Sequence, residues 1–234
     1  MERDVLEVDV LVLGAGAAGL SCAIRLADAL AAANHEATIL VLEKGAEVGN
    51  HILSGAVMDL RALSELIPDH ADRSFPGGVA VASDEMRFLT SGGRTWKAPV
   101  TPPGLRNHGH RIVSMYRVTR WMAGQAEERG VDVYPGFAGA ELLLEDGVVC
   151  GVRTVDMGRG SDGQAKDTFE PGMDVRARVT VLAEGPRGSL TKKLVSELSL
   201  VEGRNPQIYA TGIKEVWQSV GKEMEGRVIH TLGA

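Results

Sequence analysis

An uncharged stretch near the N-terminus, from Val10 to Ile24, constrains this chain more than any other feature. A membrane-spanning helix needs roughly 18 or more consecutive apolar residues, and this stretch is shorter. Its first part, Val10–Leu13, is β-branched and Leu-rich, whereas the part that follows is rich in Gly and Ala. This change predicts a strand, a glycine turn and a helix, and it argues against a membrane anchor.

The glycines after this predicted strand have a recognised spacing. Gly14, Gly16 and Gly19 form G-x-G-x-x-G. In a dinucleotide-binding βαβ unit the first glycine makes the tight turn, the second admits a pyrophosphate, and the third lets helix and strand pack closely. The helix predicted over Ala17–Ala33 would point its first N–H groups and its positive dipole end at that pyrophosphate. Taken alone, the pattern is weak, because such glycines often mark only a turn.

The second half of a βαβ unit follows in the sequence. Thr38–Leu42 predicts a buried parallel strand, and Glu43 stands at its C-terminal end. An acidic residue at this point accepts hydrogen bonds from the hydroxyl pair of a ribose, although a solvated charge at a strand end is the simpler alternative. Together the two halves indicate a dinucleotide site.

The composition bounds the class of protein. The chain has 234 residues, of which 44% are hydrophobic and 24% charged, as in ordinary soluble α/β proteins. Its net charge of −6, without a long basic cluster, argues against nucleic acid as a partner. The acidic start MERDVLEVD lacks the features of a secretory or transit peptide. With only Cys22 and Cys150 we expect no disulfide framework, a reducing compartment, and two small buried side chains.

The remaining elements can be assigned from periodicity and turn residues. Helices are predicted over Leu60–Ile67 (capped by Asp59), Tyr116–Arg129 and Ser189–Leu198. Strands are predicted over Val79–Leu89 and Arg94–Val100 as a hairpin, around the Asp146-Gly147 turn as another, and over Val175–Ala183, with 157–174 as an exposed excursion.

These elements define an α/β fold. An N-terminal Rossmann-like βαβ unit, an antiparallel β insertion and a late strand that returns to the sheet match a glutathione-reductase-like flavoprotein plan. No interior linker divides the chain, so we expect residues 1–234 to form one flavoprotein domain. Within it, residues 79–110 form a β-hairpin insertion.

Several segments resemble electron-transfer flavoprotein:ubiquinone oxidoreductase, in its N-terminal part. They are GAGAAGLSCAIRLA, VLEKGAEVGNHILSGAVMDLRALSELIPD, NHGHRIVSMYRVTRWMAGQAEERGVDVYPG, VTVLAEGPRGSL, NPQIYATGIKEVW and GRVIHTLG. The LSGAVMDLRAL and NHGHRIV segments are more specific than the glycines. The resemblance covers nearly the whole chain and implies FAD, not NAD, as the bound dinucleotide.

The resemblance also implies roles for individual residues. The glycine loop would hold the FAD pyrophosphate and Glu43 the adenosine ribose. Ser54 and Gly55 would lie near the ribityl–flavin end, where a simple turn is the alternative, and Arg117 could contact the phosphates or be a surface charge. The full set of cofactor-binding residues is Gly14, Gly16, Ala17, Ala18, Gly19, Glu43, Lys44, Ser54, Gly55, Arg117, Phe137, Ala138, Ala183, Glu184 and Gly185. Phe137 and Ala138 would meet the adenine through backbone groups, and Ala183–Gly185 would form a later strand-end turn.

The family further implies an iron–sulfur cluster and a quinone-binding surface on a membrane. Because family members are much longer, we expect the cluster, its module and the second flavin-binding turn to lie outside this chain. Implied partners are reduced electron-transfer flavoprotein and ubiquinone. The implied location is peripheral, on the cytoplasmic face of a bacterial inner membrane, with a soluble fragment as the alternative. His110 and Pro186-Arg187 depart from the family pattern.

Other readings stay open at this stage. The chain could belong to another FAD-dependent reductase or monooxygenase, such as a geranylgeranyl-reductase-like enzyme, or be a non-catalytic flavin-binding domain. His108 and His110 form H-x-H, but a zinc site needs three or four ligands, so we expect no metal site. The hairpin Met86–Pro99, with Phe88, Trp96 and Val100, could rest on a membrane or simply form a hairpin core. We name no catalytic residue, because the chemistry would belong to the flavin.

Overall fold

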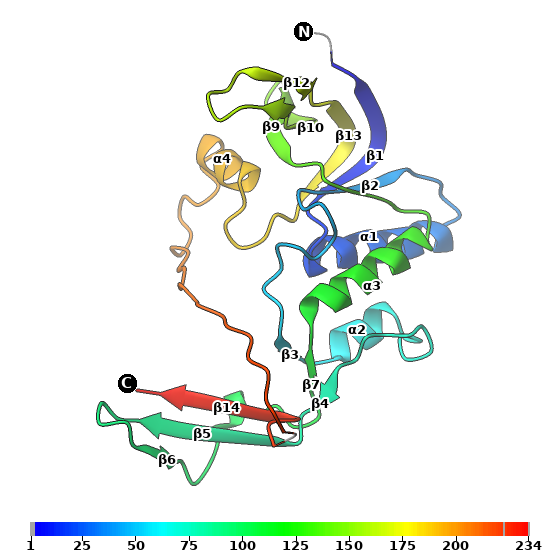
Figure 1. Ribbon diagram of the computed structural model, residues 1–234. Coiled ribbons are helices and arrows are strands. Elements are labelled where there is room, and N and C mark those ends of the chain that lie inside the picture. Colours follow the sequence, from blue (N-terminus) through cyan, green and yellow to red (C-terminus); the bar gives the residue numbers. More distant parts are fainter. Residues whose placement is uncertain (1–2, 222, 234) are drawn as a thin grey trace. The chain divides into compact units, whose positions relative to one another are not determined.

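The protein, described by a computed structural model for residues 3–221 and 223–233, divides into two compact units (Figure 1). The first comprises residues 1–52 and 119–210, and the second comprises residues 53–118 and 211–234.

The first unit is built on a six-stranded sheet with the strand order β8-β2-β1-β13-β10-β9. Strands β8, β2, β1 and β13 run parallel, and β10 and β9 continue the sheet as an antiparallel hairpin. The bounds are β1 Val5–Leu13, β2 Ile39–Glu43, β8 Asp132–Pro135, β9 Gly139–Glu145, β10 Val148–Thr154 and β13 Asp174–Leu182.

The returning strand β13 lies directly beside β1. Leu13 pairs with Leu42 of β2 on one side and with Leu182 of β13 on the other. The chain therefore leaves β1 in one direction to form β2 and comes back on the opposite side as β13. Ligands of open α/β sheets bind at such a switch point, outside the carboxyl ends of the strands.

The core of this unit joins residues from distant segments. Leu11, Leu40, Val152 and Val175 are all fully or almost fully buried and belong to one cluster, together with Leu190 of α4. Strand β2 is buried at every position, which is typical of a central strand in a parallel sheet covered by helices. Helix α1 (Ala17–Ala32) buries Gly19, Ala23 and Ala27, the small-residue face that lets it lie close to the sheet, and also Leu20 and Ile24.

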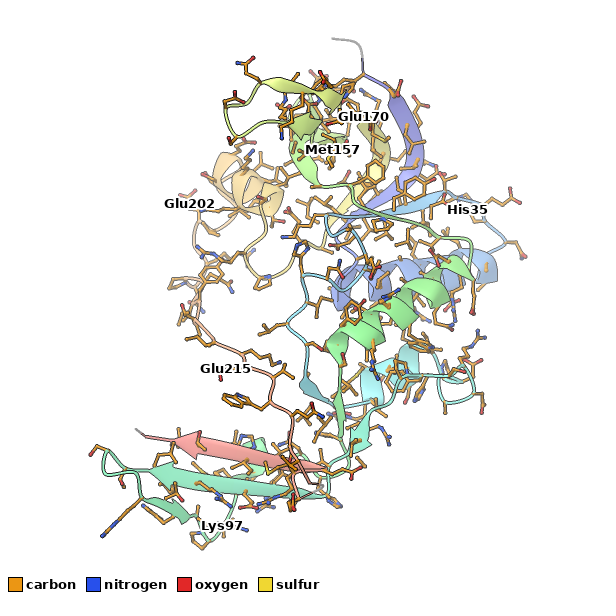
Figure 2. All side chains as sticks on the ribbon, in the orientation of Figure 1. His35, Lys97, Met157, Glu170, Glu202 and Glu215 are labelled. Atoms are coloured by element: carbon orange, nitrogen blue, oxygen red, sulfur yellow. The ribbon has the colours of Figure 1, made fainter. Side chains whose placement is uncertain are left out.

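Two further helices complete the list of elements around this sheet. Helix α3 (Met115–Glu127) belongs to the first unit from Thr119 onward, and α4 spans Leu190–Glu197. A small hairpin of β11 (Met157–Arg159) and β12 (Ala165–Glu170) occupies the Gly/Asp-rich excursion, with Met157 opposite Glu170 (Figure 2). The excursion is largely exposed, as predicted, and its two strands pair as an antiparallel hairpin.

The second unit contains two small sheets. One has the order β14-β5-β6 and the other β3-β7-β4. The bounds are β3 Ala56–Met58, β4 Val79–Ala80, β5 Ser83–Leu89, β6 Thr95–Lys97, β7 Arg111–Val113 and β14 Arg227–Leu232, with helix α2 at Arg61–Leu66 and a 3₁₀ turn at Pro103–Leu105. The β5/β6 hairpin is confirmed, and Lys97 of β6 lies opposite Arg87 (Figure 2).

The prediction of a single strand over Val79–Leu89 is wrong. The segment is divided between β4 and β5, which belong to different sheets. At the break, the Val81 N–H donates to His110 O at 3.0 Å and the Ala82 N–H to Gly226 O at 2.7 Å. Long-range backbone hydrogen bonds, invisible in the local pattern, therefore redirect the chain there.

Most of the other predicted helices and strands are present in the structure. The Asp146-Gly147 hairpin, the helices near 61–66, 115–127 and 190–197, and the strand near 174–182 are confirmed. Asp59 accepts the Arg61 N–H at 3.0 Å, but the N-cap residue of α2 is Leu60, so the predicted cap at Asp59 is wrong by one residue. Cys22 and Cys150 are half-buried, so the prediction of fully buried thiols is wrong.

Candidate nucleotide-binding site

The glycine loop lies at the C-terminal ends of β1 and β13, between which the order of strand connection reverses. Gly14 has φ +111°, and a Cβ there would lie 2.5 Å from the Ala183 carbonyl oxygen. A Cβ on Gly19 would lie 2.0 Å from the Gly14 carbonyl oxygen. By contrast, a Cβ on Gly16 would meet no atom of the described residues within 4 Å. The protein itself thus excludes side chains at Gly14 and Gly19 but leaves open space at Gly16.

The N-terminus of α1 faces this space without a side-chain cap. Gly16 is the N-cap residue, no side chain caps the helix, and no acidic residue lies in its first turn. The first intrahelical bond runs from the Leu20 N–H to Gly16 O at 3.0 Å. Ala17 and Ala18 are exposed. The N–H groups and positive dipole end of this helix are therefore available to an anion.

Glu43 ends β2 and its carboxylate is fixed against the same loop. Oε2 accepts the Ala15 N–H at 3.0 Å, and Oε1 accepts the Gly45 N–H at 2.8 Å. The residue is 9% exposed, and His51 Nδ1 lies 3.8 Å from Oε1. Each carboxylate oxygen can accept a further hydrogen bond. Lys44, the next residue, is exposed.

The sequence reasoning did not identify Ala15 and Gly45 as partners of Glu43. Both contribute backbone N–H groups, and any non-proline residue carries such a donor. No side-chain pattern could have revealed them.

Phe137 and Ala138 follow β8, and half of their backbone groups are already paired. The Phe137 N–H donates to Glu43 O at 2.9 Å, and Ala138 O accepts the Val155 N–H at 2.9 Å. Within the described part of the chain, the Phe137 carbonyl and the Ala138 N–H have no such partner. One acceptor and one donor are therefore left side by side along the chain.

The turn Ala183–Gly185 closes the other side of the glycine loop. The Ala183 N–H donates to Leu13 O at 2.8 Å, and Gly185 has φ +89°. The Glu184 carboxylate accepts hydrogen bonds from the start of α4. Burial alone would raise the pKa of Glu184, but hydrogen bonds from Thr191, Leu190 and Ser189 outweigh it and hold that pKa below its usual value. Its side chain caps a helix, while its predicted contact with a cofactor stays a prediction.

Ser54, Gly55 and Arg117 belong to the second unit. The Ser54 hydroxyl lies 2.8 Å from that of Ser114, and the Gly55 carbonyl, at φ +83°, accepts a hydrogen bond from Lys214 Nζ. Arg117 is exposed on α3 and has no hydrogen bond or ion pair with the described residues. The roles predicted for these three residues stay predictions.

The described residues bear on the H-x-H pair and on the hairpin that was considered as a membrane contact. Among them, no group of three or more His, Cys, Asp or Glu side chains could hold a metal ion. His110 Nε2 lies 3.8 Å from Asp59 Oδ2. No helix in the described ranges is both long and apolar enough to cross a membrane. In the β5/β6 hairpin, Trp96 stacks on Phe88 with 4.5 Å between ring centroids and is 56% exposed.

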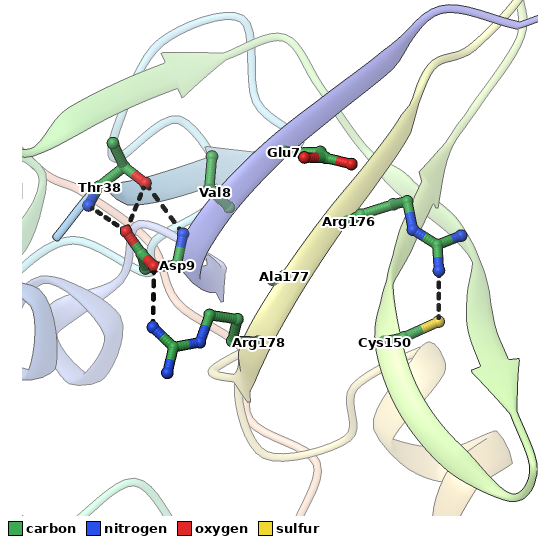
Figure 3. Close-up of a pocket in the computed structure, with 8 residues that line it drawn as sticks. All are labelled: Glu7, Val8, Asp9, Thr38, Cys150, Arg176, Ala177 and Arg178. Atoms are coloured by element: carbon green, nitrogen blue, oxygen red, sulfur yellow. Dashed lines mark hydrogen bonds and ion pairs between the residues drawn. The ribbon is translucent and has the colours of Figure 1, made fainter.

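A pocket of about 370 Å³ lies away from the glycine loop, near the start of β2 and along the first half of β1 (Figure 3). Its polar groups mostly pair with one another. Asp9 accepts hydrogen bonds from Thr38 and, at 3.2 Å, from Arg178, while Arg176 lies 3.9 Å from Cys150 Sγ. None of its lining residues was predicted to bind the nucleotide; they are Glu7, Val8, Asp9, Thr38, Cys150, Arg176, Ala177 and Arg178.

Comparison with known folds agrees with this geometry. The family described as NAD(P)-binding Rossmann-like domain matches residues 12–77. A geranylgeranyl bacteriochlorophyll reductase-like structure from Thermoplasma acidophilum covers 88% of this chain and 44% of its own, with TM-score 0.51 and 21% identity. The myxobacterial chondrochloren halogenase, an FAD-dependent enzyme, covers 80% of this chain and 39% of its own, with TM-score 0.53 and 20% identity. The chain has the Rossmann-like fold of FAD-dependent oxidoreductases.

Curated relatives are much more similar in sequence. The electron transfer flavoprotein-ubiquinone oxidoreductase of Oryza sativa is 46% identical over 99% of this chain and 40% of its own length. Those of Dictyostelium discoideum and Pseudomonas aeruginosa are 47% and 44% identical, over 38% and 43% of their lengths. By sequence the chain is thus similar, over essentially its whole length, to the N-terminal part of these relatives. The family resemblance is thereby confirmed over the reductase-like alternative.

Proposed function

We propose that this chain binds FAD at the glycine loop and forms the FAD-binding part of an oxidoreductase that passes electrons from reduced electron-transfer flavoprotein to ubiquinone. The observation that carries the proposal is the contrast among the three glycines. A Cβ at Gly16 would meet no atom of the described residues within 4 Å, so packing does not require a glycine there, and a bound ligand would explain it. A pyrophosphate at the uncapped start of α1 fits this space and the dipole of the helix.

The residues around the loop supply the remaining contacts of the proposed site. Glu43 would accept hydrogen bonds from the adenosine ribose with the oxygen lone pairs that Ala15 and Gly45 leave free. The Phe137 carbonyl and the Ala138 N–H would pair with the amino group and ring nitrogen on one edge of the adenine. FAD itself would supply the electron transfer. The chain holds and orients it, and Ser54, Gly55 and Arg117 stay candidates for its flavin and phosphate ends.

The partners are proposed from the names of the relatives. Those proteins are called electron transfer flavoprotein-ubiquinone oxidoreductases, and this chain spans about two-fifths of their length. We propose the same two partners and peripheral contact with a bacterial inner membrane at its cytoplasmic face. An iron–sulfur cluster usually requires four cysteine thiolates, and the sequence has two cysteines. We therefore propose that a cluster, where one is needed, is bound by residues other than these 234.

Flavin titration tests the proposal. Purified protein, refolded without added nucleotide if necessary, is dialysed and titrated with FAD, with NAD and NADP as controls, and flavin fluorescence and the visible spectrum are recorded. We expect about one FAD per chain and no comparable binding of NAD or NADP. A chain that folds but leaves the FAD signal unchanged would contradict the proposed site.

The same preparation tests the electron-transfer role. Metal analysis should find no stoichiometric iron, and little ubiquinone should be reduced by this chain with reduced electron-transfer flavoprotein. Stoichiometric iron, or sustained quinone reduction, would show that these residues hold more of the machinery than we propose.

A further inference from the structure

Glu184 lies in the turn between β13 and α4, and its carboxylate is surrounded by donors from one helix end. Oε2 accepts the Thr191 N–H and the Thr191 hydroxyl, each at 2.7 Å. Oε1 accepts the Ser189 N–H at 3.1 Å and the Leu190 N–H at 3.2 Å. Four hydrogen bonds thus join one side chain to the first turn of α4. Ser189, the N-cap residue, contributes no side-chain cap of its own.

A glycine makes room for this arrangement. Gly188 has φ +54°, and a Cβ there would lie 2.8 Å from Thr191 Cβ and 3.0 Å from Glu184 Oε2. The turn is therefore shaped around the carboxylate, which the chain could not accommodate with a larger residue at Gly188.

The residue next to Glu184 forms one wall of the glycine loop. The carbonyl oxygen of Ala183 would lie 2.5 Å from a Cβ on Gly14, and the Ala183 Cβ would lie 3.2 Å from one on Gly19. Ala183 is thus in close contact with the first and third glycines. Any shift of this turn would be transmitted directly to the backbone of the loop.

Another attachment of α4 is apolar. Leu190 is 1% exposed and belongs to the core cluster of the sheet. It holds the first residue of α4 against the sheet, and Lys193 Nζ donates to Ala140 O at 3.5 Å further along the helix, but neither contact involves the turn that precedes α4. The four hydrogen bonds of Glu184 supply the missing constraints.

We propose that Glu184 is a positioning residue for the nucleotide site. By fixing α4 to the turn after β13, it holds Ala183 in place against Gly14 and Gly19. This inference deepens the proposed FAD site and rests on it for its effect on affinity. In this role the Glu184 side chain maintains the shape of the glycine loop and makes no contact with FAD.

The experiment compares Glu184→Gln, which keeps the size of the side chain but not its charge, with Glu197→Gln, an exposed residue near the other end of α4. Hydrogen–deuterium exchange of the protein without nucleotide is followed over residues 10–24, and FAD affinity is measured by fluorescence. For Glu184→Gln we expect faster exchange in the glycine loop and FAD binding weakened by about fivefold, the effect of losing a helix cap. Glu197→Gln should match the wild type.

Thr191 offers a graded second test. Thr191→Val removes the hydroxyl donor but keeps the N–H, and should give a smaller change than Glu184→Gln, whereas Thr191→Ser should restore wild-type behaviour. A Glu184→Gln variant that melts at a lower temperature yet keeps wild-type loop exchange and FAD affinity would overturn the inference. If the wild type binds no FAD, the proposed function fails, and the loop exchange still decides whether Glu184 positions the loop.

Discussion

Helices α1 and α4 follow the C-terminal ends of two neighbouring parallel strands, but their N-termini are completed differently. Helix α1 starts at Gly16 with no side-chain cap and two exposed alanines, Ala17 and Ala18. Helix α4 starts with the carboxylate of Glu184 already bonded to its first turn. Since a helix N-terminus attracts an anion in either case, the open one is free for a ligand and the filled one is part of the scaffold.

The glycines of the open end give the largest expected effects. Gly19→Val would place side-chain atoms on the Gly14 carbonyl, because a Cβ there lies only 2.0 Å from that oxygen. Such overpacking costs about 3 kcal/mol or more, which lowers the melting temperature by roughly 6–12 °C in a chain of this size. Gly16→Val should instead leave the melting temperature near the wild-type value and weaken FAD binding by roughly 100-fold or more.

Thermal denaturation without nucleotide and FAD titration measure the two outcomes separately. The comparison would fail if Gly16→Val lowered stability as much as Gly19→Val, because the space at Gly16 would then serve packing. Unchanged FAD content of dialysed Gly16→Val would remove the phosphate-binding role from this loop.

Glu43 gives a second test of the uncapped N-terminus of α1, because its carboxylate is bonded to the glycine loop and not to α4. A hydrogen bond to a charged acceptor contributes about 1.5–3 kcal/mol, so Glu43→Ala should weaken FAD binding by roughly 10–100-fold. It should not create a preference for NADP. Glu43→Gln keeps one oxygen acceptor for the N–H groups of Ala15 and Gly45, and should give a smaller loss.

Fluorescence titration of these variants is compared with Glu36→Ala, a change at an exposed glutamate of the same unit. Equal affinity in Glu43→Ala and the wild type would reject the ribose role while leaving the pyrophosphate site intact.

The smallest expected effect is a loss of stability at low pH. Of the two helix N-termini, only that of α4 should be affected. The pKa of Glu184 is lowered in the folded protein, so its stabilising contribution is complete above the unfolded value of about 4.3 and is lost as the pH falls through the folded value. As the pH falls below about 4.3, hydrogen exchange corrected for intrinsic rates should increase in residues 189–198 before it increases in residues 17–32.

Glu184→Gln provides the control, because its α4 should exchange at a rate that no longer changes over this pH range. Simultaneous loosening of both helices in the wild type would show that acid unfolds the whole unit and that the cap is not the sensitive element.

The sequence by itself determined the open end of the site. The spacing of Gly14, Gly16 and Gly19 after an apolar run predicted the strand, the turn and the helix, because glycine requirements are local properties of the backbone. The same is true of the Asp146-Gly147 hairpin, whose two turn residues both have positive φ. Buried apolar periodicity likewise predicted β13 and its return to the sheet.

Only the tertiary structure decided the contacts between distant segments. It split Val79–Leu89 into two strands, because β5 pairs with β14, which lies far along the chain. It joined Glu43 to the N–H groups of Ala15 and Gly45, and it turned the Glu184 carboxylate toward α4. Backbone donors carry no residue-specific signal, and a carboxylate's partner depends on where the fold brings it, so neither arrangement can be derived from a local pattern.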